Sequence, residues 1–462
     1  MNFKSGEDLI KLRNHIGISQ SGLAELSNIK QAKISSYELG KNLLNKNEFE
    51  KILFVLNNNE LLNKVKDRKK RYQFSEKKNG IKNSERRRKY KVSDRNREFL
   101  SELNNLWESH LNDEKNINTL SLFSGCGGFS LGSSAAGYNI LGNIEISNDA
   151  QRIYSLNFKS EFLSSDISKV SEHKLKELRK SLPKIQVIIG GPPCQGFSLT
   201  GKRDKEDKRN YLFKDYLRFV ARFSPKIAVM ENVDKLLSMK NKEGELVIFK
   251  IEEEFKKIGY KIQYKKFNTS DFGVPQNRFR VFFVAVRDDI NKEPSFPSKM
   301  YEEPNNQLNL RNVKEKYNFA DAVSDLPFLE SGENSNFHLH KTVDHPQHVI
   351  DWLWNVPEGK SAHDNESEDM RPPSGYNTTY KRQYWMKPAS TVQTTFGMIS
   401  GSNNVHPIAT RSLTIREAAR IQSFPDEFIF KGTKSGIRRS IGNAVPPLFA
   451  KYLMSFLRDE FF

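Results

Sequence analysis

One of the two cysteines in this 462-residue chain stands where a nucleophile could be presented to a ligand. Cys194 follows Gly-Gly-Pro-Pro at residues 190–193, directly after an expected strand at residues 186–189. Two glycines and two prolines favour a stiff, non-helical loop, and reactive thiols typically occupy partly exposed, electropositive positions of this kind. The alternative is a buried, inert cysteine, which would give such a loop little purpose. The pattern therefore predicts that Cys194 acts as a nucleophile.

Acidic and basic side chains stand at two further expected strands. Glu231 ends a strand at residues 226–231, where its carboxylate could give a proton or a hydrogen bond to a heterocycle held over the thiol. Gln276, Arg278 and Arg280 lead into a later strand. Because alternate side chains of a strand share a face, we expect these three to point together into the site. Taken singly, each could instead be a polar residue on the surface of an edge strand.

A glycine-rich turn at residues 124–128 follows the expected strand at residues 118–123. Glycines let the backbone approach a ligand closely, and the turn leads into a helix whose N-terminus carries partial positive charge. Glu145 ends the next strand, where an acidic side chain accepts hydrogen bonds from ribose hydroxyls, and Asp166 follows the third strand, where it could accept from an adenine amino group. The alternatives are a structural turn and two helix caps. Together these residues favour a pocket for an adenosine-containing cofactor.

Short apolar runs alternate with helical stretches from residue 117 onward. The expected strands are residues 118–123, 139–145, 161–165, 186–189, 226–231, 260–267 and 280–287. Such alternation indicates an α/β fold with a doubly wound, mostly parallel sheet, whose ligand crevice lies at the carboxyl ends of the strands. Residues 288–377 are rich in Pro, Asn, Asp and His, which favours a smaller, loop-rich domain. Helices are expected again at residues 415–422 and 447–458.

Short helices are expected in residues 5–56, at the N-terminus. A first amphipathic helix is followed by a second that begins after the expected cap Ser19, and a third runs from about residue 30 to 37 and ends at Gly40. Short helices joined by tight turns suggest an all-α helix-turn-helix module.

The chain is strongly basic, with a formal net charge of +18 and a pI near 9.5. Clustered Lys and Arg favour a polyanionic partner, nucleic acid first, although a basic protein from a Lys-rich proteome is the alternative. Residues 64–91 concentrate this charge, with 14 Lys or Arg against three acidic residues. We expect a solvated linker there, which is either a plain tether or a grip on a DNA backbone.

Composition also excludes several classes of protein. Two cysteines argue against a disulfide framework and against a zinc site of several thiolates, so no metal site is expected. No apolar run approaches the ~18 residues needed to span a bilayer, and the N-terminus lacks the pattern of a secretory signal. A cytoplasmic location without membrane contact is therefore expected.

Taken together, these segments resemble the DNA (cytosine-5) methyltransferase family from about residue 117 to the end of the chain. The blocks similar to the family's motifs are, in order, residues 123–128, 192–195, 209–213, 231–233, 276–280, 416–425 and 442–447. The resemblance implies a catalytic domain at residues 117–287 that is completed by residues 404–462. It also implies a target-recognition domain at residues 288–403.

The resemblance further implies a defined chemistry with S-adenosylmethionine as cofactor. The thiolate of Cys194 would add to carbon 6 of a cytosine swung out of the duplex, while Glu231 steadies or protonates ring nitrogen 3. Arg280 would contact the base oxygen, with Arg278 nearby. The residues implied to bind the cofactor are Phe123, Ser124, Gly125, Gly127, Gly128, Glu145, Ile146, Asp166, Ile167, Pro192, Asn443 and Val445.

Residues 1–62 separately resemble the phage-repressor class of helix-turn-helix domains. Gln31 and Lys33 would face the DNA groove, although Lys30 stands where the class usually has a helix cap. In the catalytic domain, Gln276 is expected to contact DNA. Residues 63–100 would form the basic linker between the two parts.

The sequence thus predicts methylation of cytosine in a specific sequence of double-stranded DNA, in a bacterial restriction-modification system, with transcriptional autoregulation by the N-terminal module as an added role. A restriction endonuclease acting on the same site and a second copy bound through the N-terminal domain are expected partners. Two alternatives stay open: a DNA-binding regulator with an inactive methyltransferase scaffold, and an RNA cytosine methyltransferase. The presence of Cys194, Glu231 and Arg280 disfavours the first, and Gly196 and Phe197 fit the DNA branch rather than the RNA branch.

Overall fold

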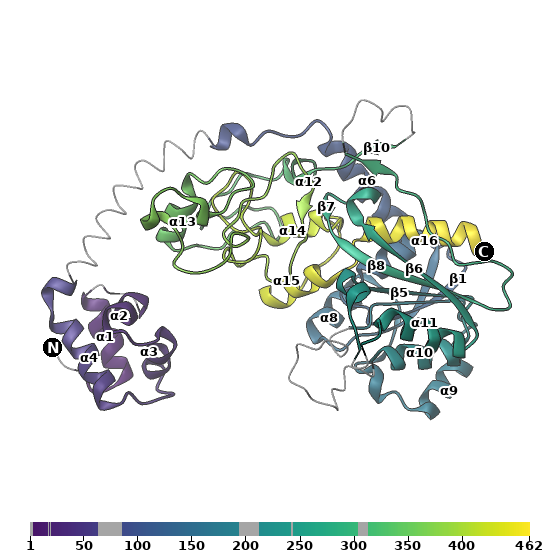
Figure 1. Ribbon diagram of the computed structural model, residues 1–462, viewed down its shortest axis with the longest axis horizontal. Coiled ribbons are helices and arrows are strands. Elements are labelled where there is room, and N and C mark those ends of the chain that lie inside the picture. The colour runs from purple at the N-terminus through teal and green to yellow at the C-terminus, as the bar shows by residue number, and fades with distance from the viewer. Residues whose placement is uncertain are drawn as a thin grey trace. The chain divides into compact units, whose positions relative to one another are not determined.

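The computed structural model describes residues 3–16, 18, 20–62, 86–193, 212–241, 244–303 and 313–462. Cys194 lies outside the described residues, as do Ser19 and most of the basic tract. The chain divides into two units, residues 1–89 and residues 90–462, which are drawn in Figure 1. Within the described ranges, no helix combines the length and the apolar character that crossing a membrane requires.

The N-terminal unit is all-α, as expected. Its helices are α1 (Gly6–Ile16), α2 (Gln20–Ser27), α3 (Gln31–Glu38) and α4 (Lys46–Asn57), of which α4 was not predicted as a separate helix. Leu9, Leu23, Ile34 and Ile52 are completely buried and supply one core residue from each helix.

A buried carboxylate joins three of these helices. Glu38, at the end of α3, accepts hydrogen bonds from Arg13 Nε at 2.8 Å and from Gln20 Nε2. Helix α3 begins after Lys30, whose side chain makes no cap hydrogen bond. Because a helix of eight residues without a cap is marginal alone, the Glu38 network and the core hold α3 in place.

The second unit is built on a seven-stranded sheet in the order β3-β2-β1-β4-β5-β8-β6. Strands β1 to β5 pair in parallel, whereas β8 pairs antiparallel with both β5 and β6. All seven expected strands are confirmed. Their bounds are β1 (Ile117–Leu122), β2 (Tyr138–Ile144), β3 (Glu161–Ser164), β4 (Val187–Gly190), β5 (Ile227–Val233), β6 (Tyr260–Asn268) and β8 (Phe279–Arg287).

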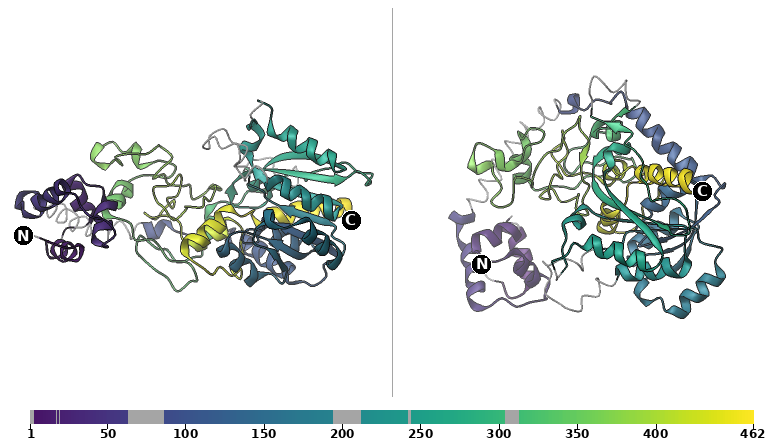
Figure 2. Two further views of the ribbon diagram at one scale, coloured as in Figure 1. Left: turned by 90° about the horizontal axis from the view of Figure 1, so that it is seen from below. Right: turned by 45° about the vertical axis from the view of Figure 1, so that its right-hand side comes forward.

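Two hydrophobic layers cover the faces of the sheet. Side chains of a strand alternate between faces, so Val187 and Ile189 enter one layer and Ile188 the other. The first layer contains residues of α6 (Asn96–Leu111), α7 (Gly128–Ala135), α8 (Asn148–Asn157) and α16 (Pro447–Phe461); the second contains residues of α9 (Glu172–Ser181), α10 (Leu212–Phe223) and α11 (Val247–Lys257). The yellow C-terminal helix α16 lies beside the sheet in Figure 1 and Figure 2.

Residues 90–100 differ from their expected role as part of the linker. The Tyr90 hydroxyl donates to the carbonyl of Val323 at 2.7 Å, and its ring centroid lies 4.9 Å from that of Trp385. Asn96, the first residue of α6, donates to the carbonyl of Asp321. These contacts place residues 90–100 in the second unit. The high positive charge of residues 64–91 gave no sign that Tyr90, near their end, packs against this unit.

Residues 288–403 are loop-rich, as expected. Their elements are β9 (Tyr301–Glu302), β10 (Lys314–Glu315), α12 (Phe319–Val323), α13 (Gln347–Trp354), β11 (Ala389–Ser390) and two single turns at residues 362–364 and 368–370. Arg382, which is 2% exposed, donates to five backbone carbonyls, including those of Leu353, Val356 and Ala409. Irregular backbone can be buried here because this guanidinium donates hydrogen bonds to its carbonyl oxygens.

A pair of buried amides joins four segments of the second unit. Gln276 lies in β7 (Gln276–Asn277), which pairs with β11, and its Oε1 accepts from the Val392 amide at 2.8 Å. Its Nε2 donates to Gln422 Oε1 at 2.7 Å. Gln422 follows α14 (Ile415–Ile421), and its Nε2 donates to the carbonyl of Ile441 in α15 (Lys434–Asn443). The predicted DNA contact of Gln276 is therefore wrong, because the residue is completely buried and both ends of its amide are engaged.

We expect the substitution Gln422→Leu to lower the free energy of unfolding by about 2–4 kcal/mol. It leaves the Nε2 of Gln276 and the carbonyl of Ile441 buried with fewer partners, at about 1–3 kcal/mol for each unsatisfied group. Urea denaturation followed by circular dichroism would measure the change. The control is Gln263→Leu on the exposed side of β6, and equal midpoints for the two variants would contradict the role of the amide pair.

Candidate active site

A pocket lies where the carboxyl ends of β1, β4 and β5 meet the C-terminal segment. The residues that line it are Ser121, Leu122, Phe123, Ser124, Gly125, Gly128, Phe129, Gly190, Gly191, Glu231, Asn443, Ala444 and Val445. The structure thus brings together half of the predicted cofactor residues and the predicted catalytic carboxylate. Gly191 and Ala444 belong to quoted motifs but were given no role from the sequence.

The glycine-rich turn makes a tight fit with the C-terminal segment. Phe123 and Gly125 both have positive φ, of 54° and 56°, so the backbone curls back at the end of β1. A Cβ on Gly128 would lie 2.3 Å from the carbonyl oxygen of Val445. Only glycine permits this approach, which closes the pocket with residues 443–445. Gly127 is needed for packing instead, because a Cβ at this position would clash with the ring of Phe158.

Glu145 holds the turn from the neighbouring strand end. Its Oε2 accepts from the Gly125 amide and its Oε1 from the Ser147 amide, each at 2.8 Å. Burial raises the pKa of this carboxyl, and the backbone hydrogen bonds oppose the rise. The next residue, Ile146, is 71% exposed although apolar. A carboxylate with remaining acceptor capacity beside an exposed apolar side chain fits a ribose and a flat adenine ring.

Asp166 fills one of the two roles considered for it, that of a helix cap. It caps the short helix at Ile167–Lys169, and its Oδ1 accepts from the amide and hydroxyl of Ser168 at 3.0 and 2.7 Å. Its Oδ2 lies 3.7 Å from Lys169 Nζ, an exposed and weak pair. Ile167 is 3% exposed, so any cofactor contact from this residue comes from its backbone.

The predicted catalytic carboxylate is paired with one of the predicted arginines. Glu231 on β5 and Arg280 on β8 belong to neighbouring antiparallel strands, and Glu231 Oε1 lies 3.0 Å from Arg280 Nε. The two side chains are 14% and 17% exposed, so they are accessible from one side only. Glu231 Oε2 lies 3.2 Å from the Cβ position of Gly191. The pair therefore stands at the base of the loop that carries Cys194.

Arg278 is a buried cation with unused donors. The residue is 1% exposed, and its Nε and Nη1 have no hydrogen-bond partner among the described residues. Burial, reinforced by the nearby Arg280, lowers the pKa of this guanidinium to about 9, and Glu231 opposes the shift. Positive charge is thus concentrated on one side of Glu231, where negative charge on a bound ring would be stabilised.

Asn232 fixes the start of the nucleophile loop. Its Nδ2 donates to the carbonyl of Pro192 at 2.9 Å, and its Oδ1 accepts from the Val233 amide at 2.9 Å. Asn232 is 7% exposed. It was part of a quoted motif but had no role predicted, because a sequence does not show which carbonyl a buried amide meets.

The two cysteines have different settings. Cys126 is 1% exposed, its thiol donates to the carbonyl of Ser440, and burial raises its pKa to about 12. A thiol with so high a pKa supplies almost no thiolate at neutral pH. Cys194 lies outside the described residues, but Pro193, the residue before it, is described and exposed.

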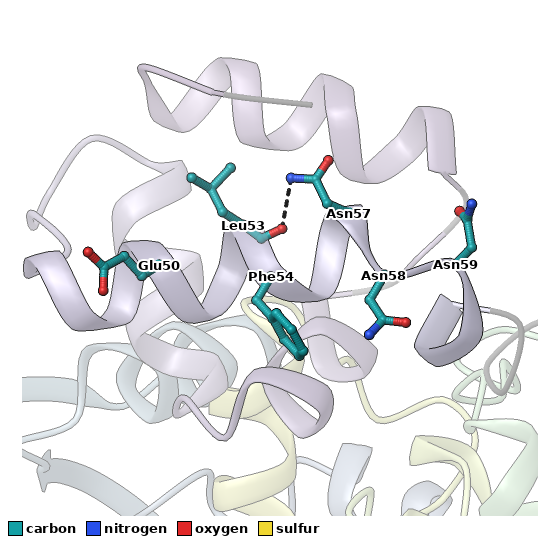
Figure 3. Close-up of a pocket in the computed structure, with 6 residues that line it drawn as sticks. All are labelled: Glu50, Leu53, Phe54, Asn57, Asn58 and Asn59. Carbon is teal, nitrogen blue, oxygen red and sulfur yellow. Dashed lines mark hydrogen bonds between the residues drawn. The ribbon is translucent and has the colours of Figure 1, made fainter.

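A second hollow lies within the N-terminal unit, on α4 and the residues after it. Figure 3 shows its lining, which consists of Glu50, Leu53, Phe54, Asn57, Asn58 and Asn59. The side chain of Asn57 donates to the carbonyl of Leu53 at 3.0 Å. The lining offers one carboxylate and no nucleophile or buried charge, so it lacks the groups that catalysis would need.

Comparison with known proteins agrees with this geometry. Residues 117–458 match the family of C-5 cytosine-specific DNA methylases. The chain belongs to this family. It is a DNA (cytosine-5-)-methyltransferase, and its methyl donor is S-adenosylmethionine. The match leaves residues 1–116 outside the family, so the N-terminal unit is identified only as helical.

Several relatives of this methyltransferase are known. It is 38% identical to the type II methyltransferase M.DdeI of Desulfomicrobium norvegicum, over 73% of this chain and 87% of that protein. It is 37% identical to M1.HphI of Haemophilus parahaemolyticus, over 72% of this chain and 84% of that protein. Among solved structures, a protein described as a DNA modification methyltransferase encoded within an E. coli prophage superposes with a TM-score of 0.58, at 25% identity, over 74% of this chain and 99% of the other.

We expect Asn232→Ala to lower kcat for DNA methylation about tenfold to a hundredfold. Loss of the hydrogen bond to Pro192 frees the start of the loop, and a displacement of about 1 Å at a reacting group costs on this scale. The affinity for S-adenosylmethionine should stay unchanged. The control is Asp234→Asn, which breaks a surface ion pair with Lys266. A kcat equal to that of the control would show that this amide does not position the loop.

Proposed function

We propose that this methyltransferase modifies a specific duplex sequence as part of a type II restriction-modification system. The observation that carries the catalytic assignment is the pair of Glu231 and Arg280 at the base of the Cys194 loop, with the buried Arg278 beside it. The type II assignment is supported by the names of the relatives, which match over more than two thirds of both chains.

The thiolate of Cys194 adds to carbon 6 of a cytosine that has left the base stack. Glu231 holds the proton or hydrogen bond at ring nitrogen 3 while negative charge develops in the ring, and Arg280 contacts the base oxygen. S-adenosylmethionine supplies the methyl group that carbon 5 takes up. Loss of the proton from carbon 5 then expels the thiolate of Cys194 and restores the aromatic ring.

The cofactor is held by residues of three strand ends and the C-terminal segment. The amides of the turn at residues 124–128 lie at the N-terminus of α7, and Glu145 would accept hydrogen bonds from the ribose hydroxyls. Ile146 would pack on the adenine ring, and Asp166 would accept a hydrogen bond from the adenine amino group. Asn443 and Val445 close the pocket beside the turn. The fit is supported by the exposed Ile146 and by the space that the glycines leave.

Residues 288–403 read the target sequence. Support comes from β11, which pairs with β7, the two residues directly before Arg278. A restriction endonuclease that cuts the same sequence stays a prediction.

A second function, binding of DNA by the N-terminal unit, is favoured by the arrangement of α2 and α3. Gln31 is exposed at the start of α3, and Lys33 forms a half-exposed pair with Glu48 at 2.6 Å that a phosphate could replace. Such a unit could bind the promoter of its own gene. Pairing of two copies through this unit is also a prediction, for which the 65% exposed Phe54 on α4 offers apolar surface.

Cys194→Ala should lower methyl transfer by on the order of a thousandfold or more while duplex binding persists, because the covalent step is lost. Incorporation of labelled methyl groups into DNA measures the effect. The matched control is Cys126→Ser, which keeps the hydrogen bond to Ser440 and should retain activity. Methylation by Cys194→Ala would refute the assignment.

DNA containing 5-fluorocytosine should become covalently trapped on the unmodified enzyme, since fluorine cannot leave as a proton does. A denaturing gel would show the trapped complex.

Deletion of residues 1–62 should leave methylation unchanged and abolish binding to the promoter of the gene. The reason is that residues 90–462 form a separate compact unit with the complete pocket. Methylation assays and gel shifts with the promoter fragment check the two halves of the prediction. Gln31→Ala in the full chain is the milder variant, and promoter binding that survives the deletion would overturn the second function.

A further inference from the structure

Arg438, on α15, is a half-buried cation that has no carboxylate partner among the described residues. Its guanidinium lies flat on the backbone of Gly397, where a Cβ would come within 2.2 Å of Cζ and 2.4 Å of Nε. Nε is buried without a hydrogen-bond partner, whereas the terminal nitrogens keep access to solvent. Among the described residues, no carboxylate lies within ion-pair distance of it. Burial alone lowers the pKa of this guanidinium.

The acid nearest to α15 contacts a different side of the helix. Asp149 Oδ2 accepts from Thr433 Oγ1 at 3.1 Å and lies 2.0 Å from the Cβ position of Gly436. Arg438 follows Gly436 by two residues, which turns its side chain about 200° around the helix. Arg438 therefore points away from Asp149. Lys434 and Arg439 add two exposed cations to α15, and the helix contains no acidic residue.

Helix α15 joins the cofactor pocket to the recognition region. Asn443 at its end lines the pocket, and Arg438 lies about 7.5 Å along the helix axis from it. A Cβ on Gly442 would lie 2.5 Å from the Thr394 amide. The segment from Thr391 to Gly397 thus runs along α15, starting beside Asn277, whose carbonyl accepts from Thr391 Oγ1 at 2.8 Å. Arg438 stands at the edge shared by this segment and the site.

We propose that Arg438 binds a backbone phosphate of the DNA, next to the extruded cytosine. A half-buried guanidinium without an acid is costly in the free protein, and a phosphodiester removes that cost through charge-assisted hydrogen bonds to the terminal nitrogens. Gly397 fixes the plane of the group, so the contact is oriented before DNA arrives. Phosphate contacts carry affinity and register and no sequence information of their own.

The test is the salt dependence of DNA binding by full-length Arg438→Met, which keeps the length and packing of the side chain. With a labelled mixed-sequence duplex and S-adenosylhomocysteine present, we expect affinity to fall roughly tenfold and the slope of log K against log salt to decrease by about 1. The KM for DNA should rise while kcat holds. The thermal midpoint and the affinity for S-adenosylmethionine should stay unchanged, since Arg438 forms no ion pair or hydrogen bond with the part of the chain that the structure describes.

Two further variants separate a phosphate contact from other roles. Arg439→Met removes an exposed charge from the same helix and should change the slope far less. Gly397→Ala keeps the charge but displaces the guanidinium, and should weaken DNA binding as Arg438→Met does. An unchanged salt slope in Arg438→Met would overturn the proposal by showing that the side chain only packs. Equal changes in Arg438→Met and Arg439→Met would overturn it as well, because they would reflect the overall positive charge of α15 and not a specific phosphate contact.

Discussion

The hydrogen bond between Gln276 and Gln422 is the contact on which the geometry of the site depends. It joins the strand that leads to Arg278 and Arg280 with the segment that follows α14. The same two amides engage Val392, at the start of the segment of residues 391–397, and Ile441, near the cofactor pocket. Because the pair is completely buried, breaking it leaves several polar groups unsatisfied at once. The amide pair therefore holds three parts in one fixed arrangement: the two arginines, residues 391–397 and the C-terminal part of the pocket.

A second constraint is steric and acts between segments more than 300 residues apart. Gly128 and Gly132 on α7 allow the carbonyls of Val445 and Pro447 to approach within 2.3 Å of where a Cβ would stand. The C-terminal helix α16 can then pack along α7, and Tyr138 fixes it further by donating to the carbonyl of Met454 at 3.0 Å. Glycines in a helix weaken it by about 1 kcal/mol each. Here that loss is offset by the packing of α16 along α7 and by closure of the pocket.

Periodicity was enough to predict the sheet, whereas the C-terminal part of the pocket was predicted only from the family resemblance. The alternation of apolar runs with helical stretches predicted all seven strands, whereas the ion pair between Glu231 and Arg280, 3.0 Å apart, was not predicted. The predicted DNA contact of Gln276 was wrong because alternation along a strand indicates which residues share a face, but it does not indicate what covers that face. The linker prediction failed from residue 90 for a related reason. A charge count cannot show that Tyr90 reaches the carbonyl of Val323, 233 residues away.

Buried arginines in this protein fall into two groups, and the difference separates structure from function. Arg382 donates to five carbonyls, Arg411 meets Glu417 at 2.7 Å with both side chains inaccessible, and Arg420 meets Asp325 and Asp426. These cations have carboxylate or carbonyl acceptors within the fold, as buried charged groups generally require. Arg278 and Arg438 keep unpaired nitrogens instead. We propose that the negative charge that completes them arrives with the substrate, from the cytosine ring at Arg278 and from the DNA backbone at Arg438.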